Sequence, residues 1–262
     1  LISIDQDTNA IEYSKKRLEK FGSKWKVFKG NFENIDTIAY MAGVDKVDGI
    51  LMDIGVSSKQ LDDPDRGFSY RYDVKLDMRM NTEQKISAYD VVNTYSEEQL
   101  SKIIFEYGEE RHARKIAKLI VEERKSSPIE KTSDLITLIK RAYPERASKH
   151  PAKKTFQAIR IEVNRELEVL GNAISKAAEL LKVGGRLAII TFHSLEDRIV
   201  KNKFKDLATA CKCPKDIPIC VCGGVKKFEI ITKKPIIPID DELKNNNRAH
   251  SSKLRILERI LD

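Results

Sequence analysis

Short apolar runs that end at an acidic or polar residue recur along this chain. The clearest run, residues 50–52, leads directly into Asp53 and then into a turn of glycine and serine. Similar runs at residues 1–5, 25–30 and 186–192 predict three more strands. Apolar runs this short are typical of strands buried on both faces of a parallel sheet. The pattern predicts an α/β fold in which the residues after the strands share one edge.

Helical periodicity fills the middle of the chain. Ser96-Glu97-Glu98-Gln99 is a capping box that opens one helix. Apolar residues spaced at i, i+3 and i+4 then indicate two more helices before Pro144. No strand is expected among these helices. We therefore predict that residues 93–151 form a small all-helical domain inserted into an α/β domain made of residues 1–92 and 152–262.

The end of the chain returns to strand character. Residues 228–232 and 254–260 are apolar and β-branched. We expect them to form an antiparallel pair at the edge of the sheet.

Four side chains at predicted strand ends are candidates for chemistry: Asp5, Phe32, Asp53 and His193. In nucleotide-binding α/β folds an acidic residue at a strand end accepts hydrogen bonds from a ribose, which would suit Asp5. Phe32 could lie against an adenine ring, although packing under a helix is equally common for a single phenylalanine. A surface turn after a core strand is the plain alternative for Asp53.

The positive net charge of the chain favours an anionic binding partner. Its 262 residues carry 48 lysines and arginines against 40 acidic residues, a net charge of +8. Basic residues gather in two stretches, 140–154 and 198–234. Solvated surface would explain either stretch alone. Two stretches that flank one predicted site favour contacts with RNA phosphates, which position an RNA without reading its bases. No apolar run is long enough for a transmembrane helix, so we expect no membrane partner.

Four cysteines lie close together in the sequence, as Cys211-x-Cys213 and Cys220-x-Cys222. Zinc is one hypothesis, because four thiolates in a short loop suit tetrahedral coordination. However, paired C-x-C is less usual than C-x₂-C, and two prolines restrict the loop. Disulfides are not expected in a cytosolic chain. Our prediction is that no metal is bound.

Six motifs in this chain resemble the RsmH (MraW) family. They are residues 48–63, 66–70, 76–80, 107–111, 155–160 and 192–198. The similarity covers essentially the whole chain, with the motifs in the family's order and spacing. Members of that family are S-adenosylmethionine-dependent methyltransferases that act on a cytosine N4 of bacterial 16S ribosomal RNA. The resemblance implies a Rossmann-like class I methyltransferase sheet.

The resemblance also implies a cofactor site for S-adenosylmethionine. Asp5 would hold the ribose hydroxyls, Phe32 would contact the adenine, and Asp53 and Gln60 would complete the site. Lys59 stands where the family often has proline, a departure next to Gln60.

We predict that Asp53 and His193 are the catalytic residues. The amino group of cytosine is a poor nucleophile because its lone pair is delocalised into the ring. Placing its nitrogen in line with the methyl carbon would supply most of the catalysis. The Asp53 carboxylate, or the carbonyls of Ile54 and Gly55, would accept the amino protons, with His193 as a second acceptor. The methyl donor carries a positive charge on sulfur, so no metal is expected. The target base must be unstacked to reach the site.

The resemblance implies 16S ribosomal RNA or the small ribosomal subunit as the partner and a cytoplasmic location. It leaves the oligomeric state open, with a homodimer as one option. The first strand of the family and its Gly-rich loop are absent from residues 1–262, so we expect a sheet without its central strand.

Three other functions are compatible with these patterns. A nicotinamide-dependent dehydrogenase would also place Asp5 on a ribose, but the Asp53 loop and the basic stretches argue against it. A non-catalytic RNA-binding module would account for the charge alone. Another nucleic-acid amino-methyltransferase would share the same site.

Overall fold

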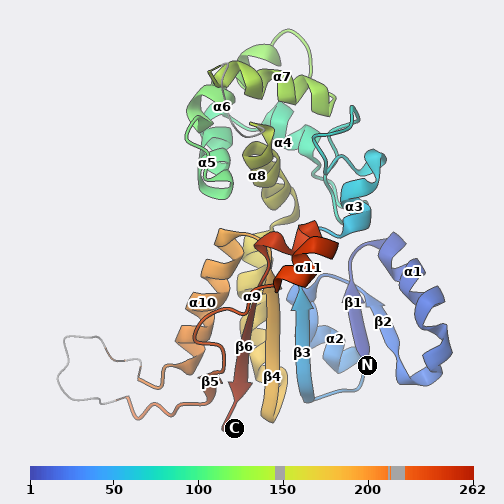
Figure 1. Ribbon diagram of the computed structural model, residues 1–262, viewed down its shortest axis with the longest axis vertical. Helices are drawn as coiled ribbons and strands as arrows, with labels where there is room; N and C mark the ends of the chain where they lie inside the picture. The colour runs from blue at the N-terminus through green and yellow to red at the C-terminus, as the bar shows by residue number, and fades with distance from the viewer. Residues whose placement is uncertain (145–150, 212, 214–221) are drawn as a thin grey trace. The chain divides into compact units, whose positions relative to one another are not determined.

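The structure of this chain is a computed structural model that describes residues 1–144, 151–211, 213 and 222–262 (Figure 1). The chain divides into two compact units. Unit 1 comprises Leu1–Gly55 and Leu167–Asp262, and unit 2 comprises Val56–Glu166. Among the residues described, no helix has both the length and the apolar character needed to cross a membrane.

Unit 1 holds the strands, which form two sheets. In the first sheet, β1 (Ile2–Asp5) and β2 (Lys26–Lys29) pair in parallel. The second sheet has the order β3-β4-β6-β5. Its strands are β3 (Val47–Asp53), β4 (Leu181–Thr191), β6 (Lys253–Arg259) and β5 (Phe228–Ile230). β3 and β4 are parallel, whereas β6 is antiparallel to both of its neighbours. The predicted antiparallel pair at the end of the chain is confirmed, with β6 inside the sheet and β5 at its edge.

The sheet of unit 1 is interrupted among the described residues, as expected for a sheet without its central strand. Among the described residues, β1 pairs with β2 alone and β3 pairs with β4 alone. Figure 1 shows β1 and β3 pointing the same way within the unit. The interruption would suit one more parallel strand, and the existence of that strand stays a prediction.

The irregular start of β4 contains two adjacent glycines, Gly184 and Gly185. Gly184 has a φ of +80°, and a Cβ on Gly185 would lie 2.9 Å from the Lys182 carbonyl oxygen. The ladder with β3 is regular only from Arg186, which pairs with Gly49. Glycine is needed here because the backbone is left-handed at one position and tightly packed at the next.

Helices cover the sheets of unit 1. They are α1 (Thr8–Leu18), α2 (Ile35–Met41), α9 (Glu166–Leu180), α10 (Ser194–Ala208) and α11 (Asp240–Asn245), with the 3₁₀ turns η1 (Glu19–Lys24), η2 (Phe32–Asn34) and η4 (Asn247–Ser251). Leu170 and Ile174 of α9 and Phe204 of α10 pack with Leu187 and Ile189 of β4 in one buried cluster. Burying each such side chain contributes about 1.5–3 kcal/mol, which anchors the strand ends.

Unit 2 is helical. Its helices are α3 (Ser58–Asp62), α4 (Ala88–Thr94), α5 (Glu97–Gly108), α6 (Ala113–Glu123), α7 (Thr132–Ala142) and α8 (Ala152–Asn164), with the 3₁₀ turn η3 (Pro64–Arg66). The three predicted helices correspond to α5, α6 and α7. The predicted capping box is formed, with Ser96 N donating to Gln99 Oε1 at 2.8 Å and Gln99 N donating to Ser96 Oγ at 3.2 Å.

Unit 2 is larger than the predicted insertion of residues 93–151, which lies within it. Phe68, Leu76 and Met80 are buried in the same cluster as the helices, although they lie in irregular chain. Asn164 at the end of α8 holds this irregular segment. Its Nδ2 donates to the Met78 carbonyl oxygen and its Oδ1 accepts from Met80 N, both at 2.8 Å. The irregular spacing of these residues explains why periodicity could not mark the boundary.

The helical stretch after residue 151 is divided between the units. α8 ends at Asn164, where Arg165 takes a left-handed conformation with a φ of 50°, and α9 begins at Glu166. α9 packs on the sheet of unit 1.

Candidate active site

Asp53 is the last residue of β3 and its carboxylate is exposed. No hydrogen bond to this carboxylate is formed by the part of the chain that the structure describes. The surrounding protein removes part of its hydration, which raises the pKa of the Asp53 carboxyl above its ordinary value. A carboxylate of this kind is well suited to accept a hydrogen bond or a proton from a ligand.

The loop after Asp53 brings the ends of β3 and β4 together. Ile54 is buried, and its N–H donates to the Ile190 carbonyl oxygen of β4 at 3.3 Å. Gly55 has a φ of +99°, and a Cβ added there would lie 3.6 Å from the Phe192 ring. A side chain would therefore fit at this position, and it is the positive φ of the backbone that favours glycine. The turn leaves the backbone of residues 53–55 beside the residues that come after β4.

His193 follows β4 as the N-cap of α10. Its Nδ1 accepts a long hydrogen bond of 3.5 Å from Glu196 N, and its Nε2 lies 3.2 Å from Glu196 Oε1. The Glu196 carboxylate also accepts from Phe192 N at 2.7 Å and from His193 N at 3.2 Å. The side chain of His193 is only 10% exposed, and that of Glu196 only 2%. The imidazole is thus part of a buried helix cap.

The ends of β1 and β2 are tied together at the same kind of edge. Asp5 is exposed, and its Oδ1 accepts from Asp7 N at 2.8 Å. Loss of hydration, and then the charge of Asp7, raise the pKa of the Asp5 carboxyl. Asn31 Nδ2 donates to Gln6 Oε1 at 3.2 Å, which links the two strand ends. Phe32 follows in η2 and is half-buried against the core.

Gln60 belongs to unit 2, unlike the other four predicted site residues. It is 8% exposed and closes a capping box at the start of α3. Its Oε1 accepts from Ser57 N at 2.9 Å, and its N–H donates to Ser57 Oγ at 3.1 Å. The local cap accounts for the side-chain oxygen of Gln60.

Glu196 is the residue of this site that the sequence patterns did not single out, although it lies within one of the six motifs. The signal was present, because a glutamate three residues after an N-cap is the pattern of a capping box. The next residue, Asp197, behaves differently from Asp53. Burial opposes its ionisation, but Arg255 and Lys253 bind its carboxylate at 2.7 Å and 3.2 Å and lower its pKa.

A basic groove of about 460 Å³ lies between α10, β5 and β6 in unit 1. Phe204 and Ile230 contribute apolar surface to it. Three exposed lysines that line it, Lys201, Lys205 and Lys233, have no acidic partner among the described residues. Unpaired cations over apolar surface fit a phosphate-bearing ligand.

The other basic stretch, residues 140–154, belongs to unit 2. Arg146 and Lys149 lie outside the described residues. Arg141 forms an ion pair with Glu123 at 3.2 Å, and Lys154 Nζ donates to the Glu109 carbonyl oxygen at 2.6 Å. The described part of this stretch is therefore partly neutralised.

Comparison with known proteins adds the family. Residues 1–260 match the MraW methylase family. The chain belongs to this family. It is 98% identical over 262 residues to the ribosomal RNA small subunit methyltransferase H of Fusobacterium nucleatum subsp. nucleatum. That match covers the whole of this chain and 83% of the relative. Proteins of the same name from Clostridioides difficile and Carboxydothermus hydrogenoformans are 54% and 51% identical over 262 residues, 99% of this chain and 84% of each relative.

Membership of the MraW methylase family confirms the resemblance found in the sequence. It also confirms the prediction of an enzyme that transfers methyl groups.

Proposed function

We propose that this chain transfers a methyl group from S-adenosylmethionine to the exocyclic N4 of a cytidine in 16S ribosomal RNA. The observation that carries the proposal is Asp53, an exposed carboxylate with a raised pKa and no protein donor among the described residues, on a strand end of an MraW methylase. The names of the relatives support small-subunit ribosomal RNA as the substrate.

The fold that accompanies this function is a Rossmann-like class I methyltransferase sheet. Unit 1 would be the methyltransferase domain and unit 2 the inserted helical domain. Parallel strands with functional residues at their carboxyl ends support this assignment.

The residues of unit 1 fit S-adenosylmethionine. Neither Asp5 nor Asp53 has a cationic partner among the described residues, so both remain acceptors. Asp5 would accept the ribose hydroxyls and Phe32 would contact the adenine. Asp53 would complete the part of the site that lies in unit 1, and the role of Gln60 stays a prediction. When bound, S-adenosylmethionine supplies an electrophilic methyl group on a positively charged sulfur.

Asp53 acts on the nucleophile. Its carboxylate accepts a hydrogen bond from the cytosine amino group, which aims the nitrogen and favours its pyramidal form. The raised pKa then suits it to receive the proton that the nitrogen loses. The carbonyls of Ile54 and Gly55 offer two further acceptors at this strand end.

His193 is the second candidate for proton transfer. Its imidazole is buried with Glu196 in the cap of α10, so a proton would have to reach it inside the protein. This arrangement favours a positioning role, in which His193 and Glu196 hold the end of β4 beside Gly55.

The groove lysines Lys201, Lys205 and Lys233 would contact RNA phosphates. The partner would be 16S ribosomal RNA or the small ribosomal subunit, and the location would be the cytoplasm, where that substrate is found. The target cytidine would be unstacked before reaching Asp53. The oligomeric state stays open.

The experiment that tests the function uses methyl-labelled S-adenosylmethionine and small ribosomal subunits from cells that lack this enzyme. We expect label in N4-methylcytidine after nuclease digestion of the 16S RNA. The Asp53→Asn variant is the matched control. Label at another base, or no label with a folded protein, would contradict the proposal.

The basic groove also favours a second candidate, a non-catalytic RNA-binding module. Isothermal titration separates the two. Binding of S-adenosylmethionine supports the methyltransferase, whereas RNA binding without cofactor binding supports the module.

A further inference from the structure

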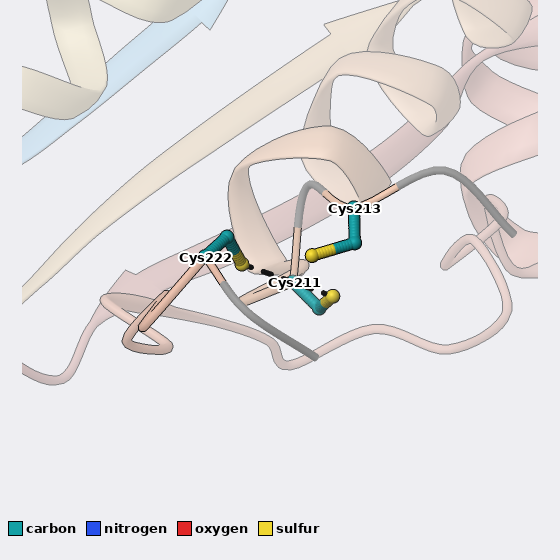
Figure 2. Close-up of side chains that lie close together, drawn as sticks. All are labelled: Cys211, Cys213 and Cys222. Carbon is teal, nitrogen blue, oxygen red and sulfur yellow. Dashed lines mark hydrogen bonds between the residues drawn. The ribbon is translucent and has the colours of Figure 1, made fainter. Parts of the chain in front are cut away.

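Three cysteines converge in the connection between α10 and β5 (Figure 2). The Sγ atoms of Cys211, Cys213 and Cys222 all lie within 4.8 Å of one another. Figure 2 shows the sulfur of Cys213 pointing toward the other two. No disulfide joins these residues. We propose that they form a zinc-binding site, contrary to the expectation from the sequence that no metal is bound.

The distances fit a shared ion. The Sγ atoms of Cys211 and Cys222 are 3.8 Å apart. Two thiolates bound to one tetrahedral zinc at about 2.3 Å would be separated by about 3.8 Å. A disulfide needs a separation of only about 2.05 Å. The observed spacing therefore matches ligands around an ion.

Burial does not account for the convergence. Cys211 and Cys222 are both exposed, so the hydrophobic effect gives them little reason to meet. Thiolates are soft ligands that select zinc over magnesium or calcium. Each thiol would lose its proton to solvent as it binds the ion.

The backbone of the loop is built for this approach. Gly223 has a φ of +57°, in the left-handed region. A Cβ on Gly224 would lie 1.8 Å from the Ala210 carbonyl oxygen and 3.3 Å from Cys222 Sγ. Only glycine lets these two arms of the loop lie so close, and this contact brings Cys222 back to Cys211.

The ion would clip the end of α10 to the chain that enters β5. Both elements line the basic groove, and Lys226, on the same connection, is one of its lining residues. Zinc would thus stabilise one wall of that groove. Cys220 lies outside the described residues. The experiment counts the sulfur ligands of the zinc without assuming that Cys220 is one of them.

The test begins with the purified chain, prepared under reducing conditions without chelators. Elemental analysis should find one zinc per chain. Cys211→Ser and Cys222→Ser should each weaken zinc binding by more than about 100-fold. A residue that only supports a metal ligand, without binding the metal, typically costs no more than about 100-fold when it is lost. Val225→Ser, an exposed neighbour that keeps every thiol, should bind zinc as the unchanged protein does.

X-ray absorption at the zinc edge counts the ligands directly. Three or four sulfurs at about 2.3 Å support the site. Fewer than three sulfurs, zinc retained by both cysteine variants, or a Cys211–Cys222 disulfide in the purified protein would overturn it.

Gly224→Ala keeps every thiol and so guards against a serine variant that fails to fold. Its Cβ should push the loop arms apart and weaken binding of zinc, and of cobalt as a spectroscopic probe. Unchanged affinity in this variant would overturn the loop geometry on which the proposal rests.

Discussion

The ends of β3 and β4 lie side by side in one sheet, yet the polar residues at these two ends differ in exposure and in hydrogen bonding. Asp53 pairs with Ile190 across the parallel ladder, and three residues beyond Ile190 comes His193. Asp53 is exposed and its carboxylate receives no hydrogen bond from the described residues. The His193 side chain is only 10% exposed and lies against Glu196.

The difference comes from the chain segment after each strand. After β4 a helix begins at once, at Ser194, and its first N–H groups need acceptors. His193 and Glu196 supply them. After β3 the chain turns at Gly55, and no helix start in the described residues uses the Asp53 carboxylate. Position at a strand end therefore makes a residue available for chemistry only where local structure does not already engage it.

The largest effect should come from Asp53→Asn. The amide cannot accept a proton, so we expect methyl transfer to fall by about 10²–10⁴-fold without loss of stability. Single-turnover transfer with labelled cofactor measures the effect. Asp48→Asn, at the other end of β3, is the control and should leave the rate unchanged. Near-normal turnover by folded Asp53→Asn protein would remove Asp53 from the mechanism.

Glu196→Ala should act on stability. It leaves the partly buried N–H groups of Phe192 and His193 without their acceptor, which costs about 1 kcal/mol. Urea unfolding measures the change, with the exposed Glu242→Ala as the control. An unchanged free energy of unfolding would show that the cap of α10 is not what holds this strand end.

Asp5→Asn tests whether the exposed carboxylate at the end of β1 also contacts a ligand. A carboxylate makes charge-assisted hydrogen bonds to ribose hydroxyls that an amide replaces only in part. We expect affinity for S-adenosylmethionine to fall about tenfold, or about 1.4 kcal/mol, with RNA affinity unchanged. Titration calorimetry measures both, and Asp45→Asn is the control. Equal losses for the two ligands would make Asp5 structural.

The pH dependence of stability should have opposite signs at Asp53 and Asp197. Because the Asp53 pKa is raised, its ionised form opposes folding, so Asp53→Asn should gain stability at neutral pH. That gain should vanish as the pH falls to the ordinary value of 3.8. Asp197 has a lowered pKa, so Asp197→Asn should lose stability at neutral pH. That loss should disappear as the pH falls below 3.8 and through the lowered pKa.

Unfolding curves of the unchanged protein and both variants over this pH range give the comparison. Differences of the same sign for the two variants would contradict the assigned environments.

The smallest effect should come from His193→Asn. Asparagine is also a good N-cap, so the fold should persist. Methyl transfer should change by less than about tenfold, well below the loss expected for a general base. A loss as large as that of Asp53→Asn would make His193 a proton acceptor and would remove the contrast between the two strand ends.

Much of the candidate site could be predicted because its signals are local. The strand ends at Asp5, Asp53 and Thr191 follow from short apolar runs and the turns after them. The Ser96 capping box follows from four adjacent residues. Gln60 carries the same local signal, because Ser57 and Gln60 have the capping-box spacing and form that cap in the structure.

The family, the order of the strands and helices, and the residues at the strand ends can be recognised in the amino-acid sequence, since each is encoded within a few neighbouring positions. The remaining features depend on packing between distant segments. The tertiary structure places the His193 side chain against Glu196. It also raises the pKa of Asp53 and brings three sulfurs together in the loop. Hydration and proximity depend on residues far away in the chain, and no local pattern records them.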